Sequence, residues 1–254
     1  MERQSDALEE LRRLGFRAPS EALRALLSQL TKARASPMET CEALVALERR
    51  EREAKNLARR TRLATLGTFK PLDAFDWNHP KSIDRSQYEE LHELAFLDKA
   101  ENVLLRGSSG LGKTMLAQNL GLAALTKGHT VLFTSLSWAL ADLLKQESIP
   151  AFERRLRRYL LPELLVIDEV GYVPCDSRSA DLLYNIISRR HEKRSTLITT
   201  NLAFKQWGTI FPGAACVVAL VDRFVQHCHV LDIEGESWRQ KKVEKPAGQR
   251  KPER

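Results

Sequence analysis

Eight residues near the middle of the chain have the types and spacing of a phosphate-binding loop. They read Gly107-Ser108-Ser109-Gly110-Leu111-Gly112-Lys113-Thr114, between an apolar run at 102–105 and an amphipathic run at 115–120. A polyphosphate needs several backbone N–H donors converging on it, and glycine permits that close approach. Lys113 is expected to reach the β- and γ-phosphate oxygens, and Thr114 to ligate Mg²⁺. A plain glycine-rich surface turn is the alternative, but the Lys-Thr pair in a strand-loop-helix setting favours a nucleotide site.

A second chemical signal is a pair of acids, Asp168 and Glu169, that ends the apolar run 164–167. Each charge at the end of a buried strand needs a partner. We expect Asp168 to lie beside Thr114 and hold Mg²⁺, and Glu169 to polarise the attacking water. A solvent-exposed loop start is the alternative. The next polar strand end contains Asn201, which could orient the same water, although asparagine after a strand is also ordinary turn chemistry.

These residues require a parallel sheet to position them, and the chain shows the matching alternation. Candidate strands at 102–106, 130–135, 163–168, 195–200 and 228–233 are separated by helical stretches. This pattern predicts an α/β fold with a five-stranded parallel sheet, covered on both faces, with ligand at the carboxyl ends of the strands. About twenty residues follow the last strand, too few for a helical lid domain.

Ahead of this core, the sequence predicts a small all-α domain. Ser20 can cap a helix with Leu23, Leu26, Leu27 and Leu30 on its buried face, and Ser36-Pro37-Met38-Glu39 reads as a capping box that opens a long charged helix. We expect a basic helical domain at 1–66, a linker at 67–80 in which Phe75 and Trp77 contact the second domain, a core at 81–240 and a disordered basic tail at 241–254.

The net charge of +7 is concentrated in two segments, 47–62 and 239–254. Clustered Lys and Arg are typical of a protein that binds the phosphate backbone. For each segment alone, a solvated helix face or a disordered solubilising tail is an equally good interpretation. The candidate DNA contacts in the first segment are Arg49, Arg50, Arg52, Lys55, Arg59, Arg60 and Arg62. The longest apolar run, 214–221, is too short to span a bilayer, and acids near the start argue against a secretory signal. The four scattered cysteines favour neither a disulfide framework nor a zinc site.

The order of phosphate loop, Asp-Glu strand and polar strand end resembles the AAA+ ATPases. Further strings resemble the IstB family, the ATP-dependent helper proteins of bacterial insertion-sequence transposition. They are Ile167-Asp168-Glu169-Val170-Gly171-Tyr172-Val173-Pro174, Ser188-Arg189-Arg190-His191-Glu192-Lys193-Arg194-Ser195-Thr196, Thr200-Asn201-Leu202-Ala203-Phe204-Lys205-Gln206-Trp207 and Ile233-Glu234-Gly235-Glu236-Ser237-Trp238-Arg239.

The resemblance implies a cytoplasmic bacterial AAA+ ATPase that lacks a lid, uses ATP and Mg²⁺, forms homo-oligomers on double-stranded DNA and assists the transposase of the same element. It also implies that Arg223 acts as an arginine finger on the nucleotide of a neighbouring subunit, with Arg189 and Arg190 as competing candidates. The main alternative is a helicase-loader-type ATPase that acts through protein contacts in replication. A small-molecule kinase is disfavoured because no segment reads as a substrate lid, and a GTPase because an Asn-Lys-x-Asp motif is absent.

Overall fold

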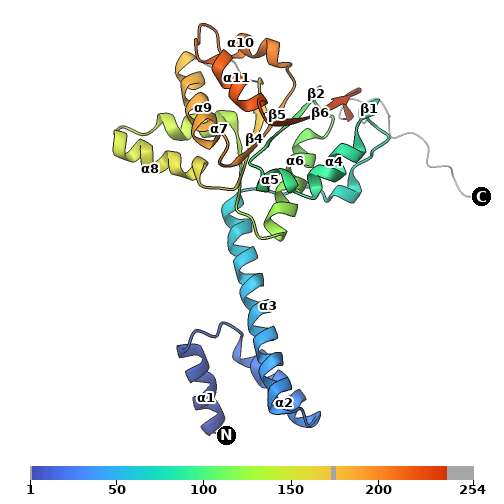
Figure 1. Ribbon diagram of the computed structural model, residues 1–254, viewed down its shortest axis with the longest axis vertical. Coiled ribbons are helices and arrows are strands. Elements are labelled where there is room, and N and C mark those ends of the chain that lie inside the picture. Colours follow the sequence, from blue (N-terminus) through green and yellow to red (C-terminus); the bar gives the residue numbers. More distant parts are fainter. Residues whose placement is uncertain (1, 173–175, 239–254) are drawn as a thin grey trace, which may run out of the picture. The chain divides into compact units, whose positions relative to one another are not determined.

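The computed structural model describes residues 2–172 and 176–238 (Figure 1). The chain forms two compact units, Met1–Arg60 and Thr61–Arg254. The division falls inside one long helix, α3 (Pro37–Ala64). Within the described ranges, no helix combines the length and the apolar character needed to cross a bilayer. The predicted tail at 241–254 lies outside the described residues.

The first unit contains α1 (Glu2–Arg13), α2 (Ser20–Lys32) and the larger part of α3. Its small core gathers Ala18, Leu23 and Leu47, with Phe16 and Leu44 among the side chains packed against them. The predicted capping box is confirmed, because the Glu39 amide donates to Ser36 Oγ at 3.3 Å and the Ser36 amide donates to Glu39 Oε2 at 2.7 Å. The amide and the hydroxyl of Ser36 lower the pKa of the Glu39 carboxyl.

A buried carboxylate secures the connection between α1 and α2. Glu48 is 8% exposed and accepts from the amides of Arg17 at 2.8 Å and Ala18 at 2.9 Å, and from Arg52 Nε at 2.5 Å. Burial by itself raises the pKa of Glu48, but the hydrogen bonds from Arg52, Ala18 and Arg17 outweigh it and hold the pKa below its usual value.

The second unit is built on a six-stranded sheet in the order β1-β6-β2-β5-β4-β3. The bounds of the five parallel strands are β2 (Asn102–Gly107), β3 (Val131–Ser135), β4 (Leu164–Val170), β5 (Ser195–Thr200) and β6 (Cys228–Glu234). The predicted total of five strands is wrong, because β1 (Ser82–Ile83) pairs antiparallel with β6 at one edge. A strand of two residues carries no periodicity that a sequence pattern could reveal.

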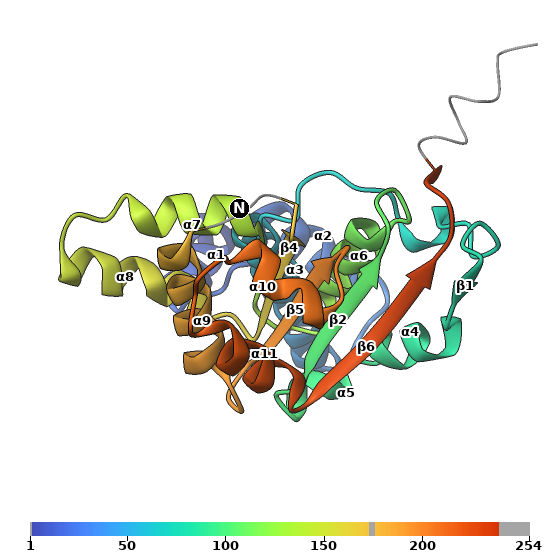
Figure 2. The ribbon, with the colours of Figure 1, turned by 90° about the horizontal axis from the view of Figure 1, so that it is seen from above.

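Helices cover both faces of this sheet (Figure 2). One face carries α4 (Arg85–His92), α5 (Ala95–Asp98) and α6 (Lys113–Thr126), and the other carries α7 (Leu136–Leu144), α8 (Ile149–Leu160), α9 (Ser177–Arg190), α10 (Trp207–Ile210) and α11 (Val217–Val225). The core of the second face includes the fully buried Trp207, Phe224 and Tyr159. Because all five parallel strands run the same way, their carboxyl ends meet along one edge, where the phosphate loop lies.

The segment predicted as a linker packs on the second unit. It contains a short 3₁₀ turn, η1 (Leu72–Ala74), followed by Phe75, whose ring lies 4.8 Å from that of Trp77. Trp77 in turn contacts Tyr88 of α4, with ring centroids 5.4 Å apart. The expected packing of Phe75 and Trp77 on this unit is therefore confirmed, and it brings residues 68–79 to the phosphate loop.

Candidate nucleotide site

The phosphate loop joins the end of β2 to the first residue of α6, and its glycines are needed for steric reasons. Gly110 has φ +80° and Gly112 has φ +84°, which is the left-handed region that favours glycine. A Cβ on Gly107 would collide with the carbonyl oxygen of Ile233, and one on Gly110 with Ser237 Oγ. The loop therefore holds its backbone against β6 and the segment that follows it. Residues 109–114, which include the start of α6, line a cavity, and the positive end of a helix favours an anion bound there.

The two functional side chains that open α6 have different surroundings. Lys113 is only 5% exposed, and its Nζ donates to the carbonyl oxygens of Gly107 at 2.6 Å and Ser108 at 2.7 Å. Thr114 Oγ1 lies 3.0 Å from Asp168 Oδ2. The structure thus brings Thr114 and Asp168 together, in agreement with the positions of their motifs in the sequence.

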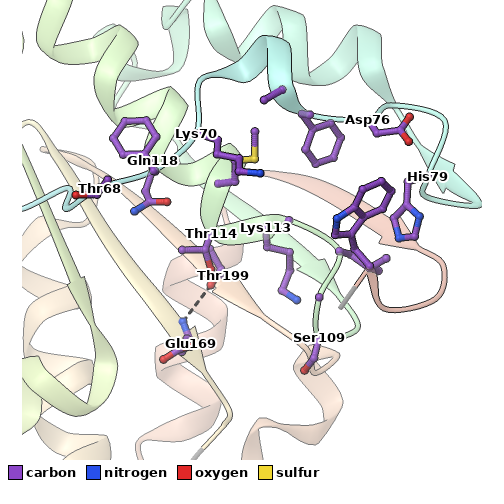
Figure 3. A pocket seen from close by; sticks show the side chains of 18 of the residues that line it. Thr68, Lys70, Asp76, His79, Ser109, Lys113, Thr114, Gln118, Glu169 and Thr199 are labelled. Carbon is purple, nitrogen blue, oxygen red and sulfur yellow. Dashed lines mark hydrogen bonds between the residues drawn. The ribbon is translucent and has the colours of Figure 1, made fainter. Parts of the chain in front are cut away.

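A third side chain, Thr199 at the end of β5, connects the two acids. Its hydroxyl donates to Asp168 Oδ1 and accepts from the Glu169 amide at 3.0 Å (Figure 3). Asp168 is 5% exposed, whereas Glu169 is exposed to the cavity. Glu169 has φ +62°, and the pairing of β4 with β5 is irregular between Ile167 and Val170. This bulge turns Glu169 away from the sheet.

A cavity of about 500 Å³, a size within the usual range for small-molecule sites, is lined by Lys113, Thr114, Glu169 and Thr199. One wall comes from the segment predicted as a linker, which contributes Thr68, Phe69, Lys70, Ala74, Phe75, Asp76 and His79. Another comes from Trp238, whose ring lies 4.5 Å from that of His79 and whose amide donates to the Gly110 carbonyl at 3.1 Å. Figure 3 shows Lys70, Asp76 and His79 across the cavity from Glu169 and Thr199.

Sequence reasoning missed Thr199, Tyr172 and the wall at 68–79 as parts of the site. The aromatic residues of the predicted linker were the available signal, because a surface linker has no need of Phe69, Phe75 and Trp77 in a short span. Thr199 carried no signal, since threonine is common in strands.

The donor set suits a hard divalent cation such as Mg²⁺. The Thr114 hydroxyl and the Asp168 carboxylate are adjacent oxygen donors beside the phosphate loop, and oxygen is the ligand type that Mg²⁺ prefers. Among the described residues, no group of three or more His, Cys, Asp or Glu side chains forms a separate metal site. Any cation here would share its coordination with the nucleotide phosphates.

The candidates for an arginine finger lie in three different environments. Arg190 is 1% exposed and donates to the backbone carbonyls of Tyr159, Leu160 and Pro162, and its burial lowers the pKa to about 9. A residue enclosed in this way cannot reach a neighbouring subunit. Arg189 is exposed and bonds to Glu153 at 2.9 Å.

Arg223, on α11, is partly exposed. Its guanidinium lies 5.0 Å from the centroid of the Tyr184 ring and donates to Ser188 Oγ.

Asn201 is exposed beyond the end of β5, and its Oδ1 lies near Gly171. It is Thr199, two residues earlier, that lines the cavity.

The basic residues predicted to contact DNA fall into two groups. Arg52 donates to the Gly15 carbonyl at 2.8 Å as well as to Glu48, and Lys55 donates to the Arg17 carbonyl, so these two side chains stabilise the first unit. Arg60 is half-buried. Arg49, Arg50, Arg59 and Arg62 are exposed, as are Arg52 and Lys55.

Comparison with known proteins places this site in a family. A family model described as IstB-like ATP binding protein matches residues 9–246. The chain is 35% identical over 235 residues to the Pseudomonas aeruginosa protein named "Insertion sequence IS21 putative ATP-binding protein", covering 92% of this chain and 89% of that protein. It is 36% identical over 201 residues to the corresponding protein of insertion sequence IS232 from Bacillus thuringiensis subsp. berliner, covering 78% of this chain and 80% of that one.

Solved structures share the fold of the second unit. DnaI superposes with a TM-score of 0.54 at 18% identity, covering 68% of this chain and 93% of DnaI. The replication initiator DnaA, solved with AMPPCP and single-stranded DNA, gives a TM-score of 0.52 at 18% identity, covering 68% of this chain and 56% of that one. The six-stranded, mostly parallel α/β fold therefore resembles the AAA+ phosphate-loop ATPase fold of these proteins. With the phosphate loop, the Asp-Glu strand end and the family match all within one chain, the protein belongs to the family of IstB-like ATP-binding proteins of insertion sequences.

Proposed function

We propose that this protein is a Mg²⁺-dependent ATPase that assembles on double-stranded DNA in the bacterial cytoplasm and assists the transposase of its insertion sequence. The observation that carries the proposal is the cluster of Thr114, Asp168, Thr199 and Glu169 beside a phosphate loop, in a chain of the IstB-like family. ATP binding is the property that the family shares by name.

The binding step uses the whole cavity. The loop amides and the start of α6 receive the phosphates, and Lys113 exchanges its bonds with the Gly107 and Ser108 carbonyls for bonds with phosphate oxygens. Phe75 and Trp238 offer apolar faces on which the adenine ring can lie. Thr114 and Asp168 would hold Mg²⁺, which would supply positive charge beside the phosphates.

The hydrolysis step depends on Glu169. Its backbone is fixed by Thr199 and its side chain is exposed to the cavity, so its carboxylate can accept a proton from a water that attacks the γ-phosphorus. The bond between the γ-phosphorus and the bridging oxygen breaks, giving ADP and phosphate. Arg223 of a neighbouring subunit supplies positive charge to the transferred group. Its partly exposed position on α11 supports this role over Arg190, which is enclosed.

Two exposed basic surfaces are available for DNA. The first is on α3, where Arg49, Arg50 and Arg59 point to solvent. The second is on α8, where Arg154 and Arg157 are exposed and Arg158 lies 5.1 Å over the ring of Trp138. Arginines gathered on one helix can neutralise the phosphates of a DNA backbone. We assign the first contact to α3 and treat α8 as its competitor.

Sedimentation with and without duplex DNA, in the presence of Mg²⁺ and a non-hydrolysable ATP analogue, tests the proposal. We expect large assemblies that need both the analogue and DNA. A protein that binds the analogue but does not respond to DNA would support the rival function, a loader-type ATPase that acts through protein contacts.

A further inference from the structure

Tyr172 lies at the phosphate loop because of the tight turn that follows Glu169, the proposed catalytic base. Glu169 has φ +62° and Gly171 has φ +99°, and this pair of left-handed residues reverses the chain at the end of β4. A Cβ on Gly171 would come within 2.9 Å of Leu202 Cδ1, so the turn is packed tightly against the segment that follows β5. The turn carries Tyr172 into the lining of the nucleotide cavity, where its side chain is 40% exposed.

The phenol oxygen of Tyr172 contacts two phosphate-loop side chains. Ser109 Oγ donates to it at 3.2 Å and Lys113 Nζ at 3.5 Å. In both contacts the phenol oxygen is the acceptor, so its own proton remains available for another acceptor. An oxygen that accepts from the lysine of a phosphate loop is the kind of atom that a terminal phosphate presents to the same lysine.

We infer that Tyr172 is a specificity-determining residue whose hydroxyl donates to the terminal phosphate of ATP and has no such partner in ADP. This inference rests on the proposed nucleotide site. When ATP binds, Lys113 and Ser109 turn to the phosphate oxygens, and the proton of Tyr172 bonds to the γ-phosphate. Tyr172 thus connects recognition of the γ-phosphate to the turn that contains Glu169.

The balance of the exchanged bonds gives the sign of the effect. Both contacts that Tyr172 gives up are long: the usual spacing is about 2.7–2.8 Å for a bond such as that from Ser109 Oγ and about 2.9–3.0 Å for one such as that from Lys113 Nζ. The bond that it gains is to a charged oxygen, which is stronger than a neutral one. We therefore expect the hydroxyl to favour ATP over ADP by about tenfold, which corresponds to about 1.4 kcal/mol.

Tyr172→Phe tests the inference, because it keeps the ring and removes only the hydroxyl. The dissociation constants of a non-hydrolysable ATP analogue and of ADP, both with Mg²⁺, are measured by calorimetry on the full chain. Tyr159→Phe is the matched control, because it removes a hydroxyl that bonds to Asp142 at 2.5 Å, away from the cavity. In Tyr172→Phe the analogue should bind about tenfold more weakly while ADP binding changes little, and Tyr159→Phe should keep the wild-type ratio of the two constants.

Three results would overturn the inference. An unchanged ratio in Tyr172→Phe would show that the hydroxyl does not select the third phosphate. Tighter binding of both nucleotides would show that Tyr172 merely competes with phosphate for Lys113. Failure of the wild-type protein to bind either nucleotide would remove the proposed function as well, whereas the first two results leave it standing.

Discussion

At the scale of single residues, Thr199 is the side chain that unites the site. Its hydroxyl bonds to the carboxylate of Asp168 and to the amide of Glu169, so one group orients both acids. Asp168 is buried and accepts from Thr114 and Thr199, which satisfies a charge that would otherwise be costly inside the protein. Removing a group that hydrogen-bonds to a metal ligand commonly lowers metal affinity or activity by about 10–100-fold.

Thr199→Val should therefore raise the Mg²⁺ concentration needed for half-maximal ATP hydrolysis by about tenfold or more. The substitution preserves the shape and removes only the hydroxyl that positions Asp168. Thr134→Val is the control, because it removes the hydroxyl of another buried strand threonine, which bonds to the Ser135 carbonyl. A normal Mg²⁺ requirement in Thr199→Val would contradict the role of Thr199 in the site.

Glu169→Gln should separate nucleotide binding from hydrolysis. The loop, Lys113, Thr114 and Asp168 are untouched, so the affinity for ATP with Mg²⁺ should stay near that of the wild type. Turnover should fall by about 10²–10⁴-fold, because an amide cannot take the proton of the attacking water. The measurement is steady-state phosphate release beside calorimetric binding, and unchanged turnover would move the catalytic base to another residue.

At the scale of elements, the main strands were predictable and the site's irregular features were not. Apolar runs such as Val103–Leu105 are buried on both sides of the sheet, which gives them a strong sequence signal. The bulge at Asp168–Glu169 and the position of residues 68–79 over the loop depend on tertiary contacts with Thr199 and with Gly112. No local pattern in the sequence encodes those contacts, and for the same reason the sequence does not indicate that Thr199 lines the cavity.

Glu48 provides a test of how the first unit is held together. Glu48→Gln should lower the free energy of unfolding of this unit by about 1–3 kcal/mol, because the amides of Arg17 and Ala18 lose a charged acceptor. Faster hydrogen exchange at those two amides in the full chain would report the change. Glu42→Gln, an exposed change on the same helix, is the control.

The same carboxylate predicts a pH dependence. Because the pKa of Glu48 is lower in the folded unit than its ordinary value of 4.5, its contribution to stability is present above that value. The contribution is lost as the pH falls from 4.5 through the folded pKa. Protection of the Arg17 and Ala18 amides should therefore decline over this acid range in the wild type and much less in Glu48→Gln. Equal decline in both proteins would exclude Glu48 as the cause.

At the scale of the whole molecule, the question is which basic surface holds DNA. If α3 does, Arg49→Glu together with Arg50→Glu should weaken binding to all duplex sequences and flatten the salt dependence, whose slope is about −0.9 per phosphate contact. Arg154→Glu with Arg157→Glu on α8 is the comparison, because it changes the net charge equally. Deletion of 241–254 tests the basic tail in the same titration. If only the α8 pair or the deletion changes the slope, α3 is not the DNA arm.

The subunit arrangement has its own test, because the proposed site is complete only when Arg223 comes from a neighbour. Arg223→Ala alone should bind ATP normally and hydrolyse it up to ~10³-fold more slowly in the assembly. Glu169→Gln alone should also be slow. When the two variants are mixed, some interfaces would pair the intact Arg223 of a Glu169→Gln subunit with the intact Glu169 of an Arg223→Ala subunit. Part of the activity should therefore return. Subunit exchange is checked by fluorescence transfer between labelled proteins. Full exchange without any recovery would mean that Arg223 acts within its own subunit or not at all. Arg189, which is exposed and paired with Glu153, would become the next residue to test.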